Sequence, residues 1–113
     1  MAAGPQIAKR APAPVMWNRR ELSEILNVYG RYVAMGEWKD YAIDGLAANA
    51  VFSIFRRASE VPMFAIIKTP ADAQRQGMYK VVAVDGQVLK RGHELPQVLR
   101  VFAKKRCRHI RNS

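Results

Sequence analysis

The chain has 113 residues, a length that suits one domain with a single hydrophobic core. Half of its residues are apolar, which argues against general disorder, but no apolar run is long enough to cross a membrane. Nineteen Lys and Arg against nine Asp and Glu give a net charge of +10, so the chain is a candidate for binding a polyanion such as nucleic acid.

The positive charge is concentrated at the C-terminal end. From Gly92 onward there are six basic residues and one acid, whereas residues 18–91 hold eleven basic and eight acidic residues. The single cysteine, Cys107, excludes an internal disulfide framework and favours a reducing compartment. The first residues lack the apolar core of a secretory signal, and we therefore expect a cytoplasmic protein with no membrane segment.

The N-terminal part predicts an arm followed by a helix. Residues 1–16 combine Pro, Ala and Gly, which is typical of a flexible arm. Asn18 and Glu21 have the spacing of a capping box, and the apolar residues that follow recur at helical intervals. This pattern predicts a helix over 19–35 that ends at Gly36.

The centre of the chain predicts paired strands. Residues 38–43 alternate imperfectly and predict a short strand, with Asp44-Gly45 as a turn. The runs 50–57 and 63–68 are rich in Phe, Ile and Val, and a Pro precedes the second, which predicts two buried strands.

The last third predicts a short helix, a hairpin and a final helix. Thr69-Pro70 and Asp72 resemble a capped helix start, and Gly77 would end that helix after about two turns. Strands over 78–84 and 87–91 would be joined by Asp85-Gly86 as a two-residue turn, a register in which Val82 faces Leu89 and Lys80 faces Arg91. An apolar stripe over 94–106 predicts a closing helix.

These elements predict an α+β fold: an antiparallel sheet of four or five strands, a helix at each end of the chain and one short inserted helix. The predicted organisation is a flexible arm over 1–16, a single domain over 17–106 and a basic tail over 107–113.

Three segments carry a family resemblance: AVFSIFRRASEVP, the upstream YGRYVAMGEWKDYAID and the downstream GMYKVVAVDGQVLKRGHEL. Together they make the chain, over roughly Trp17 to Lys104, resemble a family of small uncharacterised alphaproteobacterial proteins, a domain family of unknown function. The resemblance implies a bacterial cytoplasmic protein and implies no activity, cofactor or catalytic residue.

The predicted hairpin gives the first candidate site. Its register places Lys80 directly opposite Arg91, and two opposed cations repel unless they turn into water or share an anion. Such a pair would bind a phosphate, with Arg57 as a further contact. The alternative is a solvated edge strand whose Lys blocks aggregation, and for Arg57 a structural ion pair.

The basic C-terminal segment gives the second candidate site. Six cations lie within twelve residues, and such a cluster binds phosphate through counterion release. The alternative is a charged helix end that serves solubility. The predicted nucleic-acid-binding residues of this segment are Arg100, Lys104, Lys105, Arg106, Arg108 and Arg111.

No pattern predicts an enzyme, a metal site or a cofactor. Cys107 and His109 lack the two further ligands of a structural zinc site, and no nucleophile with its base is recognisable. The leading hypothesis is a small, basic, non-enzymatic module that binds nucleic acid. The alternative is a protein-interaction or regulatory adaptor, and neither partner identity nor oligomeric state follows from the sequence.

Overall fold

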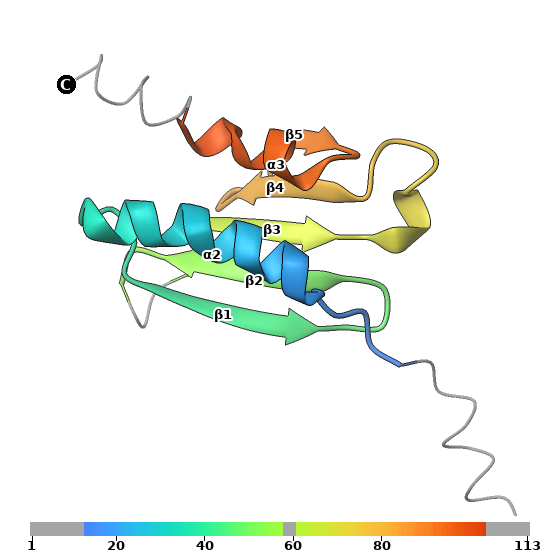
Figure 1. The fold of residues 1–113 in the computed structure, drawn as a ribbon, viewed down its shortest axis with the longest axis horizontal. Helices are drawn as coiled ribbons and strands as arrows, with labels where there is room; N and C mark the ends of the chain where they lie inside the picture. The colour runs from blue at the N-terminus through green and yellow to red at the C-terminus, as the bar shows by residue number, and fades with distance from the viewer. Residues whose placement is uncertain (1–12, 58–60, 104–113) are drawn as a thin grey trace, which may run out of the picture.

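The computed structural model describes residues 13–57 and 61–103, which form one antiparallel sheet with helices on one of its faces (Figure 1). Five strands follow one another in sequence order across the sheet, each antiparallel to the next. The predicted α+β class and the order of the elements are confirmed. Their bounds are α2 Arg19–Ala34, β1 Asp40–Gly45, β2 Ala50–Phe55, β3 Phe64–Lys68, the 3₁₀ helix η1 Pro70–Asp72, β4 Tyr79–Ala83, β5 Val88–Gly92 and α3 Leu95–Leu99.

The start of α2 is fixed by the predicted capping box. The Glu21 amide donates to the Asn18 side chain at 2.8 Å, and the Asn18 amide donates to the Glu21 carboxylate at 2.8 Å. Two amides that no helical carbonyl can reach are thereby satisfied. At the other end of α2, Gly36 has a φ of +79°. Helices commonly end at a residue in this left-handed conformation, and glycine adopts it without steric strain.

The first predicted strand and turn are wrong in their placement. Asp44 pairs with Val51 inside the sheet, and the turn lies over 46–49, where the Leu46 amide donates to the Asn49 carbonyl at 2.8 Å. Gly45 is required for a different reason, because a Cβ there would lie 2.9 Å from the Val15 carbonyl oxygen. The glycine lets the segment before α2 cross the strand closely and does not form a turn.

The β4–β5 turn also differs from the two-residue turn predicted for Asp85-Gly86. Gly86 has a φ of +90°, but no residue other than glycine among the described ones has a positive φ, so Asp85 does not adopt the mirror-image turn. The Gly86 amide donates to the Ala83 carbonyl and the Ala83 amide to the Gln87 carbonyl, each at 2.9 Å. The connection is therefore a three-residue loop.

The longer loop changes the predicted register only in part. Val82 pairs with Val88, so the predicted pairing of Val82 with Leu89 is wrong. A bulge between Val81 and Val82 then shifts the ladder back by one residue, and Lys80 does lie opposite Arg91 as predicted.

One predicted helix is shorter in the structure. The helix predicted to run from Pro70 towards Gly77 is a single 3₁₀ turn without a side-chain cap, because the Thr69 hydroxyl donates to the Asn49 side chain at 3.1 Å instead. For the predicted final helix, α3 spans Leu95–Leu99 and residues 101–103 are helical again, while the predicted residues 104–106 lie outside the described residues.

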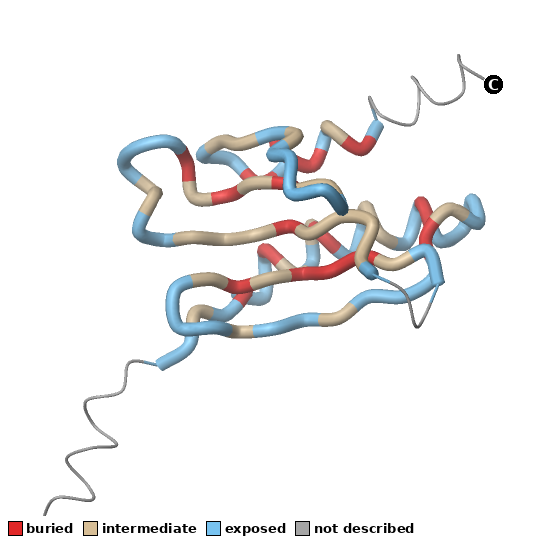
Figure 2. The backbone as a smooth tube through the Cα atoms, turned by 180° about the vertical axis from the view of Figure 1, so that it is seen from behind, coloured by how far each residue is buried: buried red, intermediate tan, exposed pale blue. Residues whose placement is uncertain are grey.

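The core lies between the sheet and the helices. Phe52 and Ile54 of β2, Ile66 of β3 and Val81 of β4 point to this side and are buried, because alternate strand residues share a face. Aromatic rings close one end of the core: Trp38 lies 4.7 Å from Tyr32 and 4.9 Å from Phe102 between ring centres. The opposite face of the sheet, seen from behind in Figure 2, is covered by no helix of the described residues. We call it the open face.

Candidate functional site

The open face carries opposite charges at its two sides. The strand pairings place one residue of each strand in a single row across this face, and the row reads Asp44, Val51, Ile67, Lys80 and Arg91. The second row reads Ala42, Ser53, Ala65, Val82 and Val88. The open face therefore has an apolar centre, an acid on the β1 side and two cations on the β4–β5 side.

The predicted pair of cations is present at the basic side of this row. Lys80 and Arg91 are partly exposed and directly opposed, and no ion pair of Lys80 occurs among the described residues. Arg91 lies 3.9 Å from the Asp72 carboxylate, which also lies 3.9 Å from Arg75. Asp72 offsets part of the repulsion between the two cations, and an anion would offset the rest.

The other predicted cations lie elsewhere. Arg57 follows the end of β2, four or more residues along the strand from the row that holds Lys80, a separation of at least about 13 Å. Arg100 follows α3 on the helix side and lines a groove of about 360 Å³ between α2 and α3, together with Arg31. The predicted residues of the basic tail, from Lys104 onward, lie outside the described residues. The described cations do not form one continuous surface.

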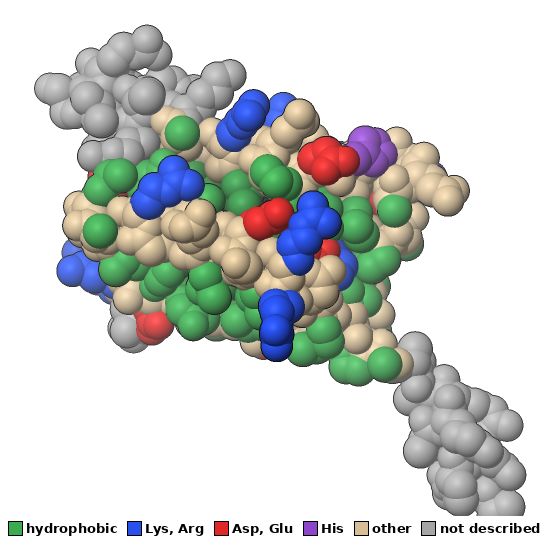
Figure 3. Space-filling view, in the orientation of Figure 1, with side chains coloured by type: hydrophobic (Ala, Val, Ile, Leu, Met, Phe, Trp, Pro, Cys, Tyr) green, Lys and Arg blue, Asp and Glu red, His purple; other side chains and the backbone are tan. Residues whose placement is uncertain are grey.

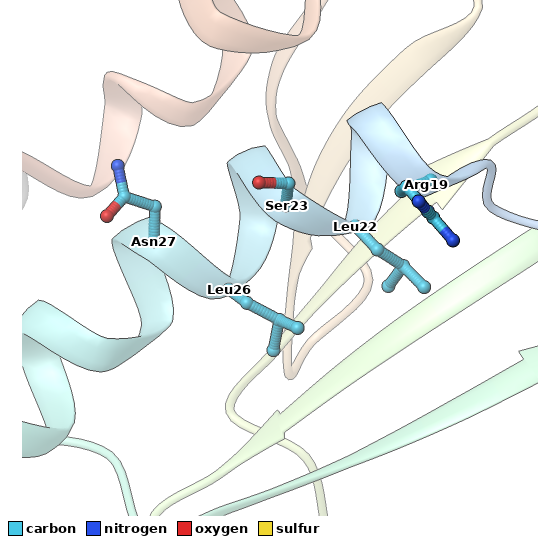
Figure 4. Close-up of a pocket in the computed structure, with 5 residues that line it drawn as sticks. All are labelled: Arg19, Leu22, Ser23, Leu26 and Asn27. Carbon is cyan, nitrogen blue, oxygen red and sulfur yellow. The ribbon is translucent and has the colours of Figure 1, made fainter.

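Exposed apolar side chains lie on the helix side, on α2 and on the edge strand β1. Leu26, Tyr41 and Ile43 are large apolar residues that are 38%, 41% and 40% exposed. An open groove of about 670 Å³ runs along α2, and all of its lining residues belong to that helix: Arg19, Leu22, Ser23, Leu26 and Asn27 (Figure 4). Figure 3 shows hydrophobic side chains gathered on this side of the molecule, below α2 and over the edge of the sheet. Isolated exposed apolar residues are common, but a cluster marks an interaction surface.

The β1 edge beside this groove is unpaired among residues 13–57 and 61–103. In an antiparallel edge strand every second residue turns its backbone amide and carbonyl away from the neighbouring strand. The Tyr41 amide donates to the carboxylate of its neighbour Asp40 at 2.8 Å, so Tyr41 and, two residues later, Ile43 are the outward-facing positions. Their side chains point to the helix side, since Tyr41 packs edge-on against Tyr29 of α2 at 5.0 Å.

A buried polar cluster joins the start of α2 to the sheet. The Glu21 carboxylate accepts hydrogen bonds from the Lys68 ammonium at 2.8 Å and from the Tyr79 hydroxyl at 2.5 Å. Burial by itself would raise the pKa of Glu21, but the bonds from Lys68, Tyr79 and the Asn18 amide outweigh it and lower that pKa. Burial and the nearby Glu21 carboxylate raise the pKa of Tyr79 far above its ordinary value.

This cluster is suited to holding the fold together. The Lys68 ammonium also donates to the Met16 carbonyl at 2.9 Å, so its charge is matched inside the protein. A cavity of about 130 Å³ beside Glu21 is lined by His93 and Glu94, and no group of three potential metal ligands occurs in the part of the chain that the structure describes. Three hydrogen bonds engage the Glu21 carboxylate, two at Oε1 and one at Oε2, and all three come from groups of the fold itself.

Sequence reasoning identified Glu21 as a helix cap but missed its links to Lys68 and Tyr79. The available signal was the Lys at the end of an apolar strand, a position where a charge needs a partner. It also missed Asp44 as part of the open face, because Asp44-Gly45 has the composition of a turn.

Comparison with known proteins identifies the family and no function. The model of one family, described as "Protein of unknown function (DUF2794)", matches residues 15–99. No curated protein and no solved structure matches the chain. No helix in the described ranges is both long and apolar enough to cross a membrane.

Proposed function

The chain belongs to a family of proteins of unknown function, and from its geometry we propose that it is a small, non-enzymatic protein-interaction module. Its docking surface is the groove along α2 together with the unpaired edge of β1 and its exposed apolar side chains. The observation that carries this proposal is that Tyr41 and Ile43 combine outward-facing backbone groups with exposed apolar side chains beside the groove. The single cysteine is the basis for placing this module in the cytoplasm.

The proposed partner is an extended segment of another protein. Such a segment adds a strand to β1 through main-chain hydrogen bonds, and its alternate side chains enter the groove beneath α2. The described residues hold twelve Lys and Arg and eight Asp and Glu, a net charge of +4, and Arg19 lines the groove itself. We therefore expect the partner segment to carry large apolar residues at alternate positions with acidic residues between or beside them.

A peptide-display selection on the whole chain tests the proposal. Enriched peptides should share alternating apolar positions and acidic residues, and binding should slow hydrogen exchange at the Ile43 amide. Their affinity should fall at least about tenfold for Ile43→Asp, because a charge then enters the apolar groove. Val84→Asp is the matched control, since Val84 is an equally replaceable exposed residue in the β4–β5 loop, 65% exposed and far from the groove in sequence. Equal affinities of the two variants, or no enrichment, would overturn the groove as a docking surface.

Nucleic-acid binding is the second candidate function, and the opposed pair Lys80 and Arg91 favours it, together with the net charge of +10. A phosphate between the two cations would relieve their repulsion. Titration of short RNA and DNA, duplex and single-stranded, at two salt concentrations measures this function. Affinity should fall steeply with salt, and Lys80→Met should reduce the slope by about one unit if Lys80 contacts a phosphate. Absence of binding at low salt would exclude this candidate.

A further inference from the structure

We propose that the open face of the sheet binds the open face of a second copy of this chain, in a symmetric dimer of two stacked sheets. This inference is independent of the groove along α2, which lies on the other side of the sheet. It rests on the order of side chains across the open face and on their charges.

The two ends and the centre of the first row of the open face are complementary when the row is reversed. A two-fold axis along β3 places each row over the same row of the partner in the opposite order. Asp44 then faces the partner's Arg91, Val51 faces the aliphatic stem of the partner's Lys80, and Ile67 faces the partner's Ile67 at the axis. Stacked sheets lie about 10 Å apart, a gap that a short Asp and a long Arg side chain bridge together.

The second row is complementary in size. Reversal places the small Ala42 opposite the partner's Val88, and the small Ser53 opposite the partner's Val82. Ala65 meets the partner's Ala65 at the axis. At the two outer pairs a small residue meets a larger one, which allows the two faces to interdigitate there.

The charges also select the direction of the axis. An axis across the strands, through the first row, would instead place each strand over the same strand of the partner, so that Asp44, Lys80 and Arg91 would each face their own copy in the partner. Like charges held together at an interface cost free energy, whereas the axis along β3 pairs opposite charges at both sides. The acid that sequence reasoning assigned to a turn thus has a binding role.

The size of the open face sets the expected strength. Five strands about 4.8 Å apart, each five or six residues long at about 3.3 Å per residue, make a face of roughly 24 by 17 Å, or about 400 Å² per copy. Stable interfaces bury about 800 Å² per partner, so this dimer belongs to the weak and reversible class. We expect a monomer–dimer equilibrium that shifts with protein concentration.

Analytical ultracentrifugation of the whole chain, freed of nucleic acid and at physiological ionic strength, tests the dimer. The wild type should shift from monomer to dimer with rising concentration. Asp44→Arg alone and Arg91→Glu alone should each weaken the dimer at least about tenfold, because each places like charges opposite one another at both ends of the row. An equimolar mixture of the two variants should restore the affinity, since in the mixed dimer both ends of the row pair opposite charges.

Matched controls and a further variant keep every outcome decisive. Glu94→Arg changes the charge by the same amount as Asp44→Arg at an exposed site on the helix side, where the Glu94 side chain forms no cap, and should leave the dimer unchanged. Lys80→Glu, in the same row as Arg91, is a second variant on the basic side and should also weaken the dimer. Circular dichroism shows whether each variant is folded. A wild type that stays monomeric at millimolar concentration overturns the proposal, as does a mixture no tighter than its components.

Discussion

The ion pair between Glu21 and Lys68 allows a quantitative test of how α2 is held on the sheet. The two side chains are only 7% and 13% exposed and meet at 2.8 Å. Lys68→Met keeps most of the aliphatic stem but removes the ammonium, and leaves the Glu21 carboxylate with the Tyr79 hydroxyl and the Asn18 amide. Glu21→Gln is the reciprocal change, and leaves the Lys68 ammonium with the Met16 carbonyl.

Each single substitution leaves one buried charge without its counter-charge. Loss of one partner of a buried pair costs about 3–5 kcal/mol. In each variant the remaining charge keeps some of its hydrogen bonds. We therefore expect each variant to lose unfolding free energy at the lower end of this range, about 3 kcal/mol. The double variant removes both charges, so its cost should also be about 3 kcal/mol, well below the sum of the singles, with a coupling free energy of about 2–3 kcal/mol.

Urea unfolding at pH 7 of the wild type, both single variants and the double variant measures these free energies. Thermal melting should show the same order, since 3 kcal/mol corresponds to a shift on the order of 15 °C for a domain of this size. The control is Glu24→Gln, which breaks an exposed pair with Arg20 at 3.5 Å and should cost less than about 0.5 kcal/mol. Additive single effects, or a cost below about 1 kcal/mol for Lys68→Met, would show that the pair does not hold α2 on the sheet.

Three further changes test other parts of the fold. Because the pKa of Glu21 is lowered, its carboxylate contributes to stability above the ordinary pKa of 4.5, and this contribution is lost as the pH falls. The difference in unfolding free energy between wild type and Glu21→Gln should therefore shrink from pH 6 to pH 3. A constant difference would contradict the lowered pKa. Gly77→Ala should destabilise by at least about 2 kcal/mol, because Gly77 has a φ of +102° and an added Cβ would lie 2.5 Å from the Gly92 carbonyl oxygen. Gly30→Ala should instead stabilise α2 by roughly 1 kcal/mol, because an added Cβ there has no atom within 4 Å. Equal melting temperatures of the two variants would refute both assignments. Phe52→Ala should cost about 3–5 kcal/mol in urea unfolding, since Phe52 has no exposed surface, and a cost near zero would mean that the core packs differently.

The elements of this fold follow from local patterns in the sequence. The capping box at Asn18 acts over three residues, and strand alternation acts over two, so neither needs information from distant parts of the chain. The order of helices and strands and the burial of Phe52, Ile54, Leu99 and Phe102 were accordingly predictable.

The positions of turns and bulges depended on contacts that local patterns do not contain. Asp44-Gly45 has the composition of a turn, but the crossing of Val15 over Gly45 keeps both residues in the sheet. The opposition of Lys80 and Arg91 was predicted from a two-residue turn, yet it arises from a longer loop and a bulge that offset one another. A correct pairing therefore rested on an incorrect turn.

What the sequence by itself determined is the class of fold, its helix caps, its core residues and its excess of positive charge. Which side chains share a surface was decided by the tertiary structure alone, because sheet register and the side on which the helices pack bring together residues dozens of positions apart. Asp44 and Arg91 lie at opposite ends of one row, whereas Arg100, only nine residues beyond Arg91, lies on the other side of the sheet. Net charge is a sum over the chain and contains no such geometry, and for this reason composition pointed to one cationic surface where the folded domain has several separate groups.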